Sequence, residues 1–158
     1  MTFDLSRFSR LDRSIVGGAA LAFISGFLPW WGYNGPLSAY SASVSGWSAG
    51  FTAWAGLLCL SLGGAYLFLR RTRTNTPQLG VGPSTAVVGA AGLGLLLVII
   101  RWLTLPRVHG GLAGSIGTKY GIWVAIVAGV VEVGAAVIAW RASGEPVPWA
   151  STDAAGSS

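Results

Sequence analysis

The stretch YGIWVAIVAGVVEVGAAVIAW, residues 120–140, decides the fold class of this chain. Its one acidic or basic side chain is Glu132, and a helix of about twenty residues crosses the ~30 Å hydrocarbon core of a bilayer. Three further stretches, residues 14–31, 49–69 and 85–105, have the same apolar character. The sequence therefore predicts an all-α membrane protein: a four-helix transmembrane bundle over 14–141, preceded by a short segment 1–13 and followed by a disordered tail, 142–158, rich in Ser, Ala and Gly.

The composition favours a membrane protein over a soluble one. Hydrophobic residues make up 53% of the chain and charged residues 9%, whereas about a quarter of the residues in soluble domains are charged. The net charge of +5 could indicate nucleic-acid binding, but the basic residues lie at the ends of apolar segments and not on one soluble face. The expected partner is the lipid bilayer, and no nucleic acid is expected.

The distribution of positive charge predicts the topology, because Lys and Arg in short loops stay on the cytoplasmic side. Seven arginines share one side of the predicted bundle: Arg7, Arg10, Arg13, Arg70, Arg71, Arg73 and Arg141. The other side receives Arg107 and Lys119, with Arg101 near its boundary. We therefore expect a multi-pass protein of the plasma membrane with both termini in the cytoplasm. An outer belt of aromatic side chains is expected at Trp30, Trp31, Tyr33, Trp47, Trp102, Tyr120 and Trp123.

The N-terminus has a second interpretation, a cleaved signal peptide, because arginines precede an apolar stretch and small residues follow at 38–45. The apolar stretch 14–31 is longer than the usual hydrophobic region of about 7–15 residues and ends in aromatic side chains, which favours a retained helix. Cleavage would leave three spans.

Every predicted helix carries small residues four positions apart, which let helix backbones approach closely in lipid. These stripes are Gly18, Ala22, Gly26; Ala55, Cys59, Gly63; Ala86, Ala90, Gly94; and Gly121, Ala125, Gly129. They predict a compact bundle, and they serve equally for packing within one subunit, for self-association or for contact with other membrane proteins.

The first outer loop, residues 32–48, contains a strand-like segment. Residues 40–45 alternate in type with period two, after a turn signal at Asn34-Gly35-Pro36. Two interpretations stay open: an extended strand across the outer mouth of the bundle that contacts another membrane protein, or an ordinary loop on the lipid headgroups.

Trp30 and Gly46-Trp47 flank this loop, and in a four-helix chain that arrangement resembles the claudin-type tetraspan proteins. The paired loop cysteines of that family are absent, since Cys59 is the single cysteine, so the resemblance carries no adhesive or pore-lining role with it. The whole chain, rich in Ala, Gly and Arg, also resembles small four-helix membrane proteins of high-GC, actinobacterial-type bacteria. That resemblance implies a bacterial plasma membrane.

Glu132 is the main candidate for an intramembrane functional or structural polar site, because ionisable groups inside a membrane segment are costly. Three roles are open to it: a structural hydrogen bond to Ser, Thr or backbone, a charge contact with a partner subunit, or a proton or cation site. Arg101 is the second candidate and the nearest basic residue, but a depth difference of about 12 Å argues against a direct pair.

No nucleophile–base pair, metal cluster or cofactor motif is present at a readable spacing, so we expect no enzyme activity, no metal and no cofactor. The expected function is that of an accessory or scaffold subunit of a cell-envelope assembly. The alternative is a homo-oligomeric small transporter or channel that uses Glu132 as a proton or cation site.

Overall fold

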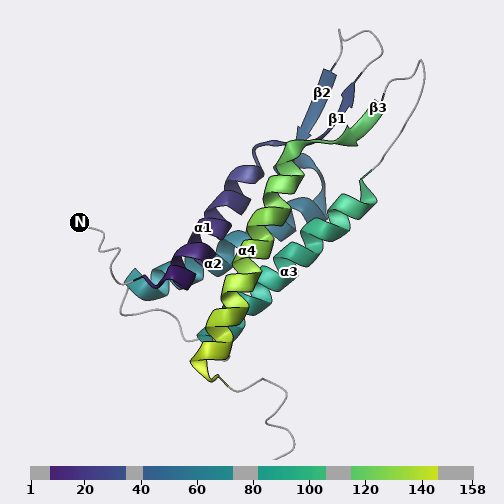
Figure 1. The fold of residues 1–158 in the computed structure, drawn as a ribbon. Coiled ribbons are helices and arrows are strands. Elements are labelled where there is room, and N and C mark those ends of the chain that lie inside the picture. The colour runs from purple at the N-terminus through teal and green to yellow at the C-terminus, as the bar shows by residue number, and fades with distance from the viewer. Residues whose placement is uncertain (1–7, 35–40, 73–81, 106–114, 146–158) are drawn as a thin grey trace, which may run out of the picture.

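The computed structural model describes residues 8–34, 41–72, 82–105 and 115–145. Within them, four helices run side by side and three short strands extend from one end of the bundle (Figure 1). The helices are α1 (Arg10–Ser25), α2 (Phe51–Thr72), α3 (Pro83–Thr104) and α4 (Tyr120–Ser143). The strands are β1 (Pro29–Asn34), β2 (Ser41–Ser45) and β3 (Ser115–Thr118), and a 3-10 turn, η2 (Gly46–Ser48), precedes α2.

Three of the helices, α2, α3 and α4, are long and apolar enough to cross a membrane. They match the segments predicted at 49–69, 85–105 and 120–140 to within a few residues. Large apolar side chains such as Leu62, Leu96 and Val127 lie on their outer faces. These helices indicate a membrane-embedded protein. The boundary of the predicted tail is wrong, because α4 continues to Ser143 and Glu145 packs on α3; residues 146–158 lie outside the described part of the chain.

The first predicted span, residues 14–31, is wrong in its limits. Helix α1 has 16 residues and ends at Ser25, and the end of that stretch forms β1 instead. Pro29 is the physical reason: it lacks a backbone N–H and disfavours the helical conformation at the residue before it. At 1.5 Å per residue α1 alone measures about 24 Å, short of the hydrocarbon core.

The strands form an antiparallel sheet in the order β2-β1-β3. Each strand continues a helix: β1 follows α1, β2 leads into η2 and α2, and β3 leads into α4. Strand β2 confirms the strand predicted from the period-two alternation of the first outer loop, and β3 is a strand that the sequence analysis did not predict.

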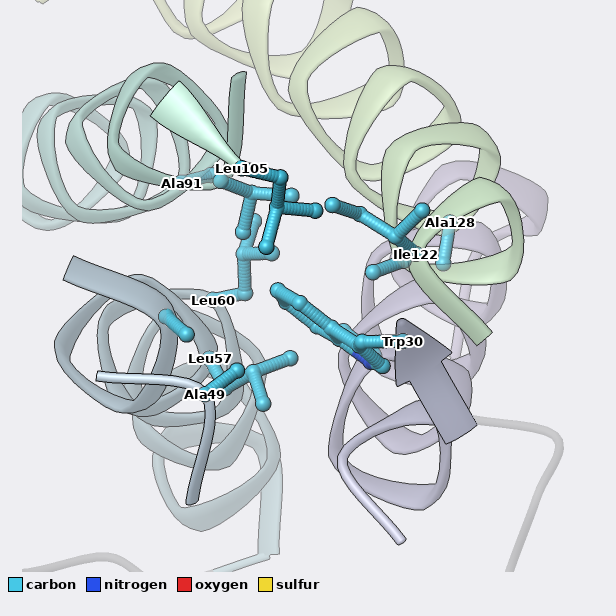
Figure 2. Close-up of a cluster of buried hydrophobic side chains, with 12 residues drawn as sticks. Trp30, Ala49, Leu57, Leu60, Ala91, Leu105, Ile122 and Ala128 are labelled. Atoms are coloured by element: carbon cyan, nitrogen blue, oxygen red, sulfur yellow. The ribbon is translucent and has the colours of Figure 1, made fainter. Parts of the chain in front are cut away.

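Trp30 closes the sheet end of the bundle. The register between β1 and β2 shifts between Pro29 and Trp31, and this irregularity leaves Trp30 unpaired on that edge. Its ring is fully buried among side chains from the surrounding helices, and its Nε1–H donates to the Ser25 carbonyl at 2.9 Å (Figure 2). The outer aromatic belt predicted to include Trp30 therefore does not contain its ring, which lies inside the bundle.

The helices approach one another through glycine and alanine. A Cβ at Gly56 would lie 3.0 Å from the Gly94 carbonyl, and a Cβ at Gly94 would lie 2.8 Å from the Gly56 carbonyl, so α2 and α3 touch through their backbones there. The stripes predicted on α1 and α4 are buried inside the bundle. On α2 the buried small residues differ in part from the prediction: they are Ala53, Gly56, Gly63 and Gly64.

Candidate functional site

Glu132 lies near the middle of α4, about 18 Å along the axis from Tyr120. Glycines on two other helices make room for it. A Cβ at Gly18 of α1 would lie 2.9 Å from the Glu132 Cβ, and a Cβ at Gly63 of α2 would lie 3.3 Å from Glu132 Oε1. The side chain therefore leaves α4, passes α1 and ends against α2 at the centre of the bundle.

The carboxyl group of Glu132 is enclosed but unpaired. The residue has 0% exposure, and neither carboxyl oxygen has a hydrogen-bond partner among the residues that the structure describes. Of the three roles open to Glu132, the structural hydrogen bond is thus not formed within those residues. A charge contact with a partner subunit does not fit the inward direction of the side chain.

Arg101 lies closer to the sheet than Glu132 does, in the last turn of α3. Its guanidinium carbon is 3.5 Å from the position that a Cβ at Gly50 would take, at the start of α2. Its Nε has no hydrogen-bond partner within 8–34, 41–72, 82–105 and 115–145, and no ion pair joins it to Glu132 there. The structure does not bring the two candidate residues together.

The opposite end of the bundle gathers the arginines. Arg10 and Arg13 lie in the first turn of α1, Arg70 and Arg71 in the last turns of α2, and Arg141 in the last turn of α4, all at the end away from the sheet (Figure 1). Arg7 and Arg73 lie outside the described residues. We call the end of the bundle that carries these five arginines, Arg10, Arg13, Arg70, Arg71 and Arg141, the basic end.

Two carboxylates that were not predicted as site residues link neighbouring helices at the basic end through an ion pair and hydrogen bonds. The first is Asp12. It accepts from the backbone N–H of Ser9 in a capping box that begins α1, and it forms an ion pair with Arg71 of α2 at 3.2 Å. The spacing Ser9-x-x-Asp12 is a variant of the capping-box signature, which was the available signal.

The second carboxylate, Glu145, caps α3 from the end of α4. It accepts from the backbone N–H groups of Ser84 and Thr85, at 3.2 and 3.1 Å, and from the Thr85 hydroxyl. Gly144 has φ +66°, a conformation that favours glycine and turns the chain back towards α3. Partial burial opposes ionisation, but these hydrogen bonds outweigh it and lower the pKa of Glu145 from its ordinary value.

A cavity of about 530 Å³ opens between the helices at the basic end. Its inner wall includes Ile15, Val87 and Ala136. Ala136 follows Glu132 by four residues on the same face of α4, so this apolar layer lies about 6 Å below the carboxyl along the helix. Trp30 therefore fills the interior at the sheet end of the bundle, whereas the basic end contains this cavity.

Comparison of the chain with protein-family models, curated proteins and solved structures gave no match. No group of three or more His, Cys, Asp or Glu side chains that could hold a metal ion occurs in the described part of the chain. The site must therefore be interpreted from its own geometry.

Proposed function

We propose that this chain crosses the bacterial plasma membrane four times, keeps both termini in the cytoplasm and serves as a non-enzymatic accessory or scaffold subunit of a cell-envelope assembly. Its partners would be other membrane proteins, bound at the outer surface. The observation that carries the proposal is the small sheet at one end of the bundle, which has an uncharged strand at its edge.

Helix α1 supplies the fourth crossing in this proposal. Hydrogen bonds of the i to i+3 type extend its last turn to Leu28, which adds about 6 Å and brings its length to roughly 30 Å. Both ends of α1 are held next to α2. Asp12 pairs with Arg71 of α2 at the basic end, and at the sheet end the backbone N–H of Trp47, in the turn η2 that precedes α2, donates to the Gly26 carbonyl. Since α2 is long enough to cross, α1 covers nearly the same depth.

The segregation of charge supports the orientation. Five of the six described arginines lie at the basic end, whereas the sheet end holds Lys119 and the sixth, Arg101. Because positive residues are retained on the cytoplasmic side, the basic end would face the cytoplasm and the sheet the exterior. The partly exposed rings of Trp123 and Tyr120 at the sheet end suit the outer interface.

The edge of β2 is the proposed association surface. In the order β2-β1-β3 it pairs on one side with β1, and no other described strand covers its second side. Its residues SASVS carry no charge and no proline, the features by which proteins usually block an open edge. The small-residue stripes of α1 and α4 are occupied inside the bundle, so they do not serve lateral docking in this proposal.

A photo-reactive amino acid at the exposed position Ala42 tests this surface. We expect cross-linking in living cells to yield one distinct partner protein, identified by mass spectrometry, and Ser43→Lys to abolish the adduct by charging the edge. The same probe at Ala142, at the basic end, is the control and should not yield that adduct. Adducts of the chain with itself alone would instead indicate a homo-oligomer and remove the accessory role.

A second candidate function, proton or cation translocation, is favoured by one observation: Glu132 is fully buried with both oxygens unpaired among the described residues. An isolated carboxylate in an apolar interior costs several kcal/mol, so the group requires a proton or a bound cation. The cavity at the basic end approaches it to within one helical turn.

Reconstitution into liposomes separates the two candidates. Flux that depends on a pH gradient, is abolished by Glu132→Gln and is retained by Glu132→Asp would exclude a pure scaffold. Modification of Glu132 by the apolar reagent dicyclohexylcarbodiimide, prevented by Glu132→Gln, would show independently that the carboxyl can react. Absence of both flux and modification would reject the translocation function.

A further inference from the structure

The cavity at the basic end has two chemically distinct parts. Its inner wall is mainly apolar and comes from all four helices, with Ile15 of α1, Leu67 of α2, Val87 of α3, and Ala136 and Ala139 of α4. Its mouth is polar, and there it is lined by Arg70, Arg71, Asp12 and Ser84. Helices α2 and α4 lie diagonally opposite each other and scarcely touch, which leaves this central space open at about 530 Å³.

The two arginines at the mouth differ in the ion pairs and hydrogen bonds that they form. Arg71 is half-exposed and pairs with the buried Asp12 at 3.2 Å. Arg70 is exposed and makes no ion pair or hydrogen bond within the residues that the structure describes. A guanidinium presents several N–H donors in a fork that matches the oxygens of a phosphate, so Arg70 is available for an anionic group.

The electrostatic surroundings favour an anion. At the basic end the structure describes five arginines and two carboxylates, Asp12 and Glu145. Both carboxylates are already engaged, one with Arg71 and the other with the start of α3.

We propose that this cavity binds an anionic amphiphile, with a phosphate group held at the mouth by Arg70 and an apolar chain lying on Ile15, Val87 and Ala139. Neither part of the cavity would suffice alone. The apolar wall gives a soluble phosphate nothing to bury, and an uncharged hydrocarbon leaves Arg70 unpaired. The site lies at the other end of the bundle from the sheet edge, so it does not depend on the proposed association at that edge.

Native mass spectrometry of the intact protein, released from phosphatidylcholine nanodiscs that contain a small fraction of lysophosphatidic acid, tests the site. We expect one retained lysophosphatidic acid per chain. Arg70→Gln should reduce this retention at least tenfold. Arg141→Gln is the matched control: it removes the same charge at the same end, but Arg141 does not line the cavity, so retention should stay within twofold of the parent chain.

Two further arms distinguish the source of the phosphate and the part played by the wall. Inorganic phosphate at millimolar concentration should not displace the lipid; displacement would mean that the site recognises free phosphate and would overturn the amphiphile. Ala139→Phe, at a partly exposed position, should fill the chain site and reduce retention while thermal unfolding shows that the protein is folded. Equal losses for Arg70→Gln and Arg141→Gln, or no retained lipid, would overturn the proposal.

Discussion

At the scale of single residues, Trp30 contributes most clearly to the stability of the bundle. Its ring is fully buried, and a Cβ at Gly46 or at Gly121 would come within 2.5 or 2.8 Å of it. Trp30→Ala would leave a cavity and lose the hydrogen bond to Ser25, so we expect the free energy of unfolding to fall by about 3–5 kcal/mol. Titration with SDS followed by circular dichroism measures this change.

Trp123→Ala is the control for Trp30→Ala, because it removes the same type of side chain from an exposed position. Trp123 is 48% exposed on α4 and packs against Trp102 with ring centroids 5.3 Å apart. Its loss should lower the free energy of unfolding by less than about 1.5 kcal/mol. Similar losses of unfolding free energy in the two variants would mean that the burial of Trp30 does not stabilise the sheet end of the bundle.

At the scale of elements, the contact between α1 and α4 depends on Gly18. A Cβ there would lie 2.9 Å from the Glu132 Cβ and 3.0 Å from the Ala128 carbonyl, both of which belong to a packed helix. Gly18→Ala should therefore force α1 away from α4 and lower the free energy of unfolding by about 1–3 kcal/mol. The neighbouring Gly17 has open space around its Cβ position, so Gly17→Ala should change it by about 0.5 kcal/mol or less.

SDS titration of the Gly17 and Gly18 variants gives this comparison within one turn of one helix. Equal effects would show that helix propensity, which both substitutions alter alike, outweighs interhelical contact. Such a result would contradict the close approach of α1 to α4.

Glu145 links α3 and α4, so we expect the stability of the protein to depend on pH. The pKa of Glu145 is lowered in the folded protein from its ordinary value of 4.5, so its stabilising effect is complete above that value and is lost as the pH falls through the folded-state pKa. Glu145→Ala should cost roughly 0.5–1 kcal/mol at pH 7, the lower part of the range for N-caps because water screens the group.

Thermal unfolding of the parent chain and Glu145→Ala between pH 7 and pH 3 measures this effect. The difference between the two proteins should be constant from pH 7 to about pH 5 and should shrink in more acid solution. A difference that persists at pH 3 would assign the role of Glu145 to packing and not to charge.

At the scale of the whole molecule, the proposed four crossings place the sheet outside and the basic end inside. In a Cys59→Ala background, a single cysteine at the exposed position Ser48 should react with a membrane-impermeant maleimide applied to spheroplasts. A single cysteine at Ala142 should react only after the membrane is permeabilised. Labelling of Ala142 in intact spheroplasts would overturn the assigned topology.

Local hydropathy and period in the sequence were enough to predict three apolar helices long enough to cross a membrane, the positions of α2, α3 and α4, and the strand β2. The end of the first helix also had a local signal, Pro29, that the apolar run around it obscured. Asp12 had a weak signal in its spacing from Ser9, and Glu145 had none, because its partners at Ser84 and Thr85 are about sixty residues away.

Which helix faces meet depends on contacts between distant parts of the chain. Hydropathy places Glu132 inside a membrane segment but cannot say whether it faces lipid, a partner or the bundle interior, since that depends on the rotation of α4 against Gly18 and Gly63. The same holds for Trp30, whose burial follows from an irregularity in the pairing of β1 with β2, and for the cavity at the basic end, which is lined by residues of all four helices. These features arise from contacts between distant segments, and such contacts leave no periodic pattern in a single sequence.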